Sequence, residues 1–279
     1  MTETQTIHEP SGHVEPAFNP GESIMHHIRD AHELEIPFLP DVRIPLPEWH
    51  AFGMDLSITK HVVMMWIVSA ILLLVFGLVA RRAGGGRVPG RLQSALEVMI
   101  IFIRDEVARK AIGPGADRYV SYLLTTFFFI LSCNLLGLIP GLATATGNIS
   151  VTASLAILAF LMIQFSGIRE YGLVKHFKNL VPSGLPGWLV LPMFGVEFIS
   201  MFVKPFALCV RLFANMMAGH VVILAFISLI FILGVVAVPV AIFFALFVHL
   251  LELLIGTLQA YIFTMLTASF IGMSAHPAH

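Results

Sequence analysis

The chain has 279 residues, of which 57% are hydrophobic and only 12% are charged, and its formal net charge is −1. No ordinary soluble domain of this size needs so much apolar sequence, so the composition excludes that class and indicates an all-α polytopic membrane protein. Both cysteines, Cys133 and Cys209, fall in apolar runs, where a thiol usually serves as a small core hydrophobe. They therefore carry no information about redox compartment.

Residues 1–58 are predicted to form an acidic, histidine-containing tail. The first sixty residues hold ten of the 17 acidic side chains, and their only Lys and Arg residues are Arg29, Arg43 and Lys60. No apolar segment with a small-residue cleavage site precedes them, so we expect no cleaved signal peptide. His26, His27 and His32 lie close together, but no zinc-like spacing accompanies them, and a short solvated or interfacial helix is the preferred interpretation.

Residues 59–279 are predicted to form the membrane domain, whose first span covers about 61–80. Twenty apolar residues suffice to cross a hydrocarbon core of ~30 Å. The loop that follows is rich in arginine (Arg81, Arg82, Arg87 and Arg91). The positive-inside rule places this loop in the cytoplasm and the tail outside. Spans at about 119–138 and 149–167 follow, and the basic loop after them is again cytoplasmic, which agrees with an N terminus outside and a C terminus in the cytoplasm.

Two segments of the membrane domain do not fit an ordinary span. Residues from about 91 to 112 mix apolar side chains with seven charged ones, which favours an amphipathic helix at the membrane surface. Residues 188–234 and 235–273 are nearly unbroken apolar stretches, about 70 Å and 58 Å long if helical. Because no polar linker interrupts either of them, they are predicted to form a hairpin of two long, strongly tilted membrane helices.

Each of these two long helices carries a single stripe of polar residues. The first stripe contains Glu197, Ser200, Lys204, Arg211 and Asn215, and the second contains His249, Glu252, Gly256 and Gln259. The spacings of 3, 4 and 7 keep each set on one helical face. If the two helices are antiparallel and turn near residue 235, their equal rise per residue means that residues at the same depth have numbers that sum to about 470. Arg211 then lies opposite Gln259, and His220 lies opposite Glu252.

Arg211 is the strongest functional candidate, because a charge near the bilayer centre costs at least ~3 kcal/mol and such residues usually face a polar path. Its guanidinium does not deprotonate, so it acts as a fixed positive charge and not as a proton carrier. His220, Glu252 and His249 are titratable relay candidates. For Ser200, Asn215 and Gln259, a role as interhelical hydrogen-bonding groups is about equally plausible. Lys204 is interpreted as snorkelling to the interface.

Three sequence blocks resemble the F-type ATP synthase subunit a family: "KPFALCVRLFANMMAGH" (204–220), "LLIGTLQAYIFTMLT" (253–267) and "NLLGLIPG" (134–141). The resemblance covers about residues 60–275. It implies that Arg211 corresponds to the essential arginine of the family. It also implies that His220 stands where some members carry Glu, and Glu252 where they carry His; both arrangements occur in the family.

The resemblance further implies an ion-translocating stator subunit of a rotary ATP synthase in a bacterial inner membrane. Its expected partners are the c-subunit ring, the peripheral-stalk b subunits, the rest of the synthase and the lipid bilayer. One half-channel would pass His220 and Glu252, a second would pass Glu197 and Ser200, and Arg211 would separate them. The chain has no nucleotide-binding motif, so we expect no catalytic site of its own, no cofactor, no metal and no nucleic-acid partner.

Three other classes are considered. A self-contained proton- or cation-coupled secondary transporter also buries charge in long or broken helices, but such folds usually show an internal repeat, and none is found. A voltage sensor needs several spaced arginines rather than one. A membrane metalloenzyme would use His249 and Glu252, yet a single pair provides too few ligands.

Overall fold

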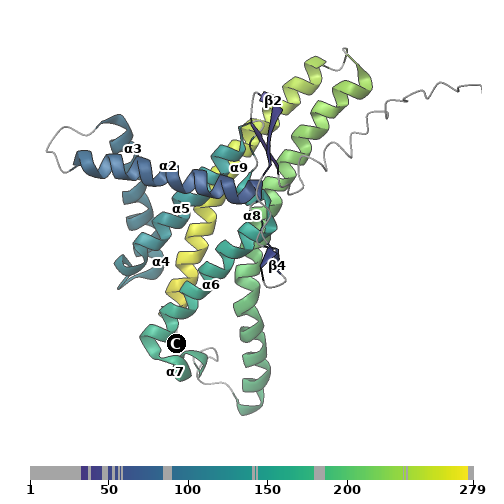
Figure 1. The fold of residues 1–279 in the computed structure, drawn as a ribbon. Helices are drawn as coiled ribbons and strands as arrows, with labels where there is room; N and C mark the ends of the chain where they lie inside the picture. Colours follow the sequence, from purple (N-terminus) through teal and green to yellow (C-terminus); the bar gives the residue numbers. More distant parts are fainter. Residues whose placement is uncertain are drawn as a thin grey trace, which may run out of the picture.

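A computed structural model of the chain describes residues 33–36, 39–45, 50, 51, 54, 55, 57, 59–83, 90–139, 142, 144–178, 186–234, 236 and 238–275 (Figure 1). Within these ranges, five helices are long and apolar enough to cross a membrane. They are α2 (Lys60–Ala83), α5 (Asp117–Gly137), α6 (Ile149–Tyr171), α8 (Gly187–Leu233) and α9 (Val238–Ala275). The predicted fold class, an all-α polytopic membrane protein, is confirmed.

The tail contributes short strands that the sequence did not predict. β1 (Glu33–Ile36) pairs antiparallel with β2 (Leu39–Pro45), and β3 (His50–Ala51) pairs antiparallel with β4 (Met54–Asp55). The segment with His26, His27 and His32, interpreted above as a short helix, lies outside the described residues. The division between tail and membrane domain near residue 58 stays a prediction.

The long hairpin of α8 and α9 dominates the molecule. The two helices lie side by side near their connection and diverge toward their other ends, where α6 packs against both of them (Figure 1). A helix of 47 residues such as α8 is about 70 Å long, more than twice the ~30 Å hydrocarbon core. Since α2 runs across α8 (Figure 1), the two cannot both stand along the membrane normal. The long helices are therefore strongly tilted, as the sequence predicted.

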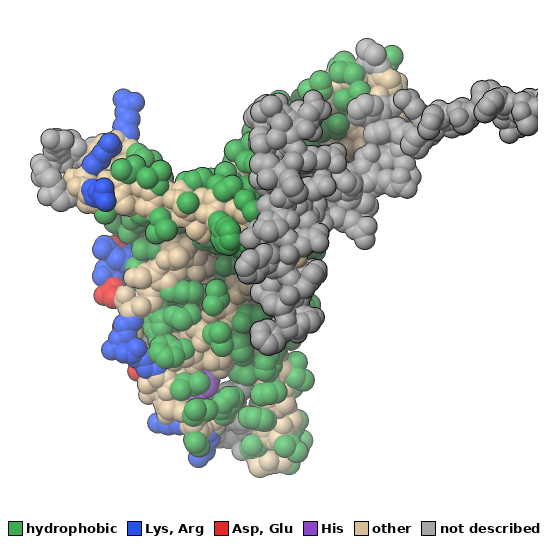
Figure 2. All heavy atoms as spheres, viewed as in Figure 1, with side chains coloured by type: hydrophobic (Ala, Val, Ile, Leu, Met, Phe, Trp, Pro, Cys, Tyr) green, Lys and Arg blue, Asp and Glu red, His purple; other side chains and the backbone are tan. Residues whose placement is uncertain are grey.

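An amphipathic rod follows α2. It consists of α3 (Arg91–Ile101), the π-helical segment η1 (Phe102–Ala108) and α4 (Arg109–Ile112), and a six-residue helix, α7 (Leu173–Lys178), follows α6. Ile103, Val107 and Ile112 are buried against the bundle, whereas the charged side chains of the rod lie outside. The predicted surface helix is confirmed, and Lys and Arg side chains gather along this edge of the molecule (Figure 2).

Most charges on the rod are paired with one another. Asp105 accepts hydrogen bonds from Arg104 and Arg109, each at 2.9 Å, and Lys110 pairs with Glu106. The hydrogen bond from Arg104 holds the pKa of Asp105 below its ordinary value. Exposed pairs of this kind contribute little to stability because water and salt screen them. The apolar inner face therefore anchors the rod to the bundle.

The core lies where α5, α9 and this rod meet. Leu123, Ile130, Phe263 and Ile271 are fully buried there. At Gly272, α9 comes so close to the rod that an added Cβ would overlap the carbonyl oxygen of Ala111. Backbone cannot move aside as a flexible side chain can, so this contact fixes the distance between α9 and the rod.

Gly272→Ala is predicted to destabilise the chain. Forcing a methyl group into this contact should cost about 1–3 kcal/mol, the usual range for overpacking. The thermal unfolding midpoint of the purified full chain in detergent measures the effect. Gly195→Ala on α8 is the matched control, because a Cβ there meets nothing within 4 Å. Equal midpoints for the two variants would contradict the described contact.

Candidate functional site

The central feature of the site is a hydrogen bond between the two long helices. His220 Nδ1 on α8 lies 2.6 Å from Glu252 Oε1 on α9, and the Glu252 side chain is only 3% exposed. Gly219 makes this approach possible, because a Cβ at that position would lie 2.7 Å from Glu252 Oε1. The predicted juxtaposition of His220 and Glu252 is present in the structure.

Thr144 fixes the other side of the His220 ring. The Thr144 hydroxyl donates to the carbonyl oxygen of Gly137 at 3.2 Å, and its oxygen lies 2.6 Å from His220 Nε2. Since the hydroxyl proton is directed to Gly137, the oxygen is left to accept from Nε2–H. That assignment leaves His220 Nδ1 and Glu252 to share one exchangeable proton, while Thr144 holds the imidazole ring in place.

Asn134 of α5 supports this arrangement from behind. Its side chain is fully buried, donates to the carbonyl oxygen of Gly256 at 2.8 Å and accepts from the Thr146 hydroxyl at 2.7 Å. Gly256 lies one helical turn after Glu252 on α9. Asn134 therefore joins α5, α9 and the loop that carries Thr144, and holds all three at one register.

A second polar pair lies further along the same helices. Asn215 on α8 donates to Gln259 Oε1 on α9 at 2.9 Å, and Gln259 is only 1% exposed. Gln259 Nε2 and Glu252 Oε2 are buried and have no hydrogen-bond partner among the described residues. The two residues are seven positions apart, about 10 Å along α9.

Arg211 lies apart from these pairs. It is exposed and makes no hydrogen bond or ion pair within the part of the chain that the structure describes. Its neighbours Leu208, Leu212 and Met216 are fully buried and define the inner face of α8. Arg211 is one residue, or about 100°, away from Leu212, so the helix turns it out of the bundle.

The pairing differs from the sequence prediction at one point. Gln259 contacts Asn215 and was expected opposite Arg211. The observed pairs sum to 472 for His220 and Glu252 and to 474 for Asn215 and Gln259. The residue numbers of facing residues sum to more than 470 because the connection between α8 and α9 begins at Gly234 and α9 begins at Val238, so the turn is centred slightly after residue 235.

The remaining predicted residues do not join this cluster. His249 is half-buried one turn before Glu252, and no three metal-ligating side chains come together in the described ranges. Glu197 and Ser200 are half-buried near the start of α8, about 21 Å and 17 Å from Arg211 along the helix. Lys204 lies over the Phe270 ring of α9, with its Nζ 5.4 Å from the ring centroid.

Known proteins are similar to this chain over most of its length. The family model described as the ATP synthase A chain matches residues 62–272. ATP synthase subunit a of Chloroherpeton thalassium is 49% identical over 261 residues, which is 91% of this chain and 77% of that protein. The subunits a of Pelodictyon phaeoclathratiforme and Anaeromyxobacter dehalogenans are 46% and 45% identical and cover 93% and 90% of the chain, or 77% and 70% of their own lengths.

The chain belongs to the ATP synthase A chain family. It is thus a multi-pass membrane subunit concerned with ion transport in ATP synthesis, without a catalytic site of its own.

Within this A chain, sequence reasoning missed the residues contributed by α5 and the loop after it. Asn134 and Gly137 belong to the block "NLLGLIPG", and Thr144 and Thr146 follow it directly. The sequence contains one indication that this loop has a role, because small polar residues stand at every second position from 144 to 148. Asn148 of this series donates weakly to His61 Nδ1 at 3.5 Å, so the loop also contacts the start of α2.

Thr144→Val is predicted to slow ATP-driven ion pumping by the assembled ATP synthase, whereas Thr144→Ser should retain most of it. Valine keeps the shape but removes the acceptor of His220 Nε2, so the half-buried ring loses the contact that orients it toward Glu252, and a lost hydrogen bond costs about 0.5–1.5 kcal/mol. Pumping rates in inverted vesicles, normalised to assembled complex, provide the measurement. If the valine and serine variants pump equally well, Thr144 does not orient His220.

Proposed function

We propose that this chain is the ion-translocating stator subunit of a rotary ATP synthase, with two offset half-channels that meet a c-subunit ring on either side of Arg211. The observation that carries the proposal is the separation of two kinds of group on α8. An ionisable pair joins half-buried His220 on α8 to buried Glu252 on α9, whereas a permanently charged arginine lies about 14 Å from His220 along α8 on an exposed face.

The line from Thr144 through His220 to Glu252 forms the first half-channel. The imidazole of His220 and the carboxylate of Glu252 share a hydrogen bond across which one proton can pass, which suits the pair to move an ion from water to a partner. The unpartnered Glu252 Oε2 and Gln259 Nε2 support a wet passage, because buried polar atoms without protein partners usually contact water. Asn215 and Gln259 extend this passage toward Arg211.

Arg211 serves as the fixed charge between the half-channels. An exposed guanidinium on an apolar helix is costly in lipid, so its exposure supports a protein partner with a carboxylate at this face. A nearby positive charge favours the ionised form of such a carboxylate, which makes the ring release its ion there. The same charge repels cations and prevents direct leakage between the half-channels.

The second half-channel is assigned to the beginning of α8. Glu197 and Ser200 are half-buried there on the same helix as Arg211. The positive-inside rule places the basic edge of the molecule (Figure 2) in the cytoplasm, so this half-channel opens to the cytoplasm and the first to the outside. Ions then enter at one, travel on the ring and leave at the other.

The proposed setting follows from this orientation. The chain is proposed to lie in a bacterial inner membrane with the N terminus outside, and with five spans the C terminus is then expected in the cytoplasm. Its partners are the c-subunit ring, the b subunits of the peripheral stalk and the surrounding lipid.

Exchanging the two members of the central pair tests whether they form one site. His220→Glu alone places two carboxylates side by side, which hold a proton too tightly, and Glu252→His alone leaves two imidazoles without an acid. Each single variant should impair ATP-driven pumping in inverted vesicles, and the double exchange should recover part of it, since residues in contact are energetically coupled. A double variant no better than the worse single variant would point to His249 as the partner of Glu252.

Impermeant thiol labelling tests the orientation. Pro20→Cys should react from outside and Gly86→Cys only from the cytoplasm, as the positive-inside rule requires. Native Cys133 and Cys209 are buried and should stay unlabelled, which provides an internal control. Labelling of the two positions from the opposite sides would reverse the assignment of both half-channels.

A further inference from the structure

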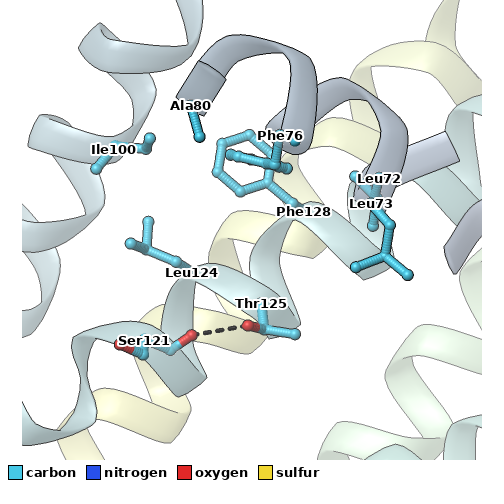
Figure 3. Close-up of a pocket in the computed structure, with 10 residues that line it drawn as sticks. Leu72, Leu73, Phe76, Ala80, Ile100, Ser121, Leu124, Thr125 and Phe128 are labelled. Carbon is cyan, nitrogen blue, oxygen red and sulfur yellow. Dashed lines mark hydrogen bonds between the residues drawn. The ribbon is translucent and has the colours of Figure 1, made fainter. Parts of the chain in front are cut away.

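A cleft lies between α2, α3 and α5, in a part of the molecule that the ion path does not use (Figure 3). Its volume of about 610 Å³ falls within the ~300–1,000 Å³ range of ordinary ligand sites. Leu72 and Phe76 line it from α2, Leu124 and Phe128 from α5, and Ile100 from α3. The size of the cleft therefore suits a defined occupant.

The chemistry of the lining calls for a hydrocarbon. Only Ser121 and Thr125 bring hydroxyl groups to the cleft, and the Thr125 hydroxyl already donates to the Ser121 carbonyl oxygen at 2.8 Å (Figure 3). The cleft opens toward the outside of the bundle, because Leu73 on its rim is 77% exposed. At Gly77 a Cβ would meet nothing within 4 Å, so the space beside α2 is free.

Positive charge is gathered next to the same cleft. Ala80 lines it and directly precedes Arg81 and Arg82, and Arg91 begins the helix that contributes Ile100. None of these three exposed arginines has a hydrogen bond or ion pair with another described residue. Three other arginines of this edge behave differently: Arg104, Arg109 and Arg118 pair with Asp105, Asp117 and Glu170.

We propose that the cleft binds one acyl chain of an anionic phospholipid whose headgroup lies against Arg81, Arg82 and Arg91. Basic residues beside membrane helices on the cytoplasmic side attract the anionic lipids of that leaflet, and each arginine near the surface changes the affinity about fivefold. An apolar helix of a partner subunit would fill the cleft but leave the three arginines unpaired. The lipid site goes beyond the proposed ion path and does not depend on it.

Photolabelling of the intact ATP synthase in phosphatidylcholine vesicles tests the site. The probe is a phosphatidylglycerol that carries a diazirine in the middle of one acyl chain, and mass spectrometry locates the label. We expect label on α2 and α5 at the residues lining the cleft, with excess phosphatidylglycerol competing and excess phosphatidylcholine competing poorly.

Two variants separate the acyl-chain site from the headgroup site. Gly77→Trp fills the cleft and should abolish the label, whereas Leu74→Trp, on the same helix but not lining the cleft, should leave it unchanged. Arg81→Gln with Arg82→Gln should lower labelling at subsaturating probe about 25-fold, while Arg169→Gln on α6 should not. Both arginines are exposed at a helix end, so this variant should assemble normally.

Three results would overturn the proposal. Equal competition by phosphatidylcholine would remove the anionic headgroup from the site. Equal labelling of Gly77→Trp and Leu74→Trp would place the acyl chain elsewhere. Absence of lipid label together with a cross-link from the cleft to a partner subunit would identify a protein helix as the occupant.

Discussion

The hydrogen bond between half-buried His220 and the buried carboxylate of Glu252 is the interaction on which the rest of the site depends. An ionisable pair inside apolar helices is tolerated only when each polar atom has a partner or contacts water. That requirement explains the surrounding sequence. Gly219 lets the carboxylate approach α8, Thr144 accepts from the imidazole, and Asn134 holds α9 at the required register. The apolar bulk of the long helices supplies the scaffold, and a few polar contacts set how the helices meet.

The site keeps a pair that can exchange a proton apart from a residue whose charge is permanent. His220 and Glu252 can exchange a proton, whereas the guanidinium of Arg211 keeps its charge under all physiological conditions. The helix geometry of α8 directs the first toward the bundle and the second away from it. In the proposed function, α8 thereby presents a residue that passes ions, His220, and a residue that repels them, Arg211, to different surroundings.

The sequence predicted much of this arrangement because length and polarity restrict membrane helices strongly. The unbroken apolar runs from 188 to 273 required two long helices, and the equal rise of those helices brought His220 opposite Glu252. The exact turn was not predictable, so Gln259 was matched with Arg211 and in fact contacts Asn215. The contact of Thr144 with His220 depends on how a loop folds back onto the helices, and the helical spacing of polar residues cannot predict such a contact. The short strands β1 to β4 were missed because each has only two to seven residues, although charged and apolar residues alternate along β1.

ATP-driven ion pumping by Arg211→Ala complexes in inverted vesicles tests the central claim most directly. Lys204→Ala is the control, because it removes the neighbouring cation of the same helix, and both rates are normalised to assembled complex. The account predicts that Arg211→Ala complexes assemble but neither pump nor make ATP, and that Lys204→Ala complexes retain most activity. Arg211→Lys should restore little activity, because lysine lacks the planar fork of arginine and deprotonates more readily when buried. Near-normal pumping by the Arg211→Ala complex would contradict the account.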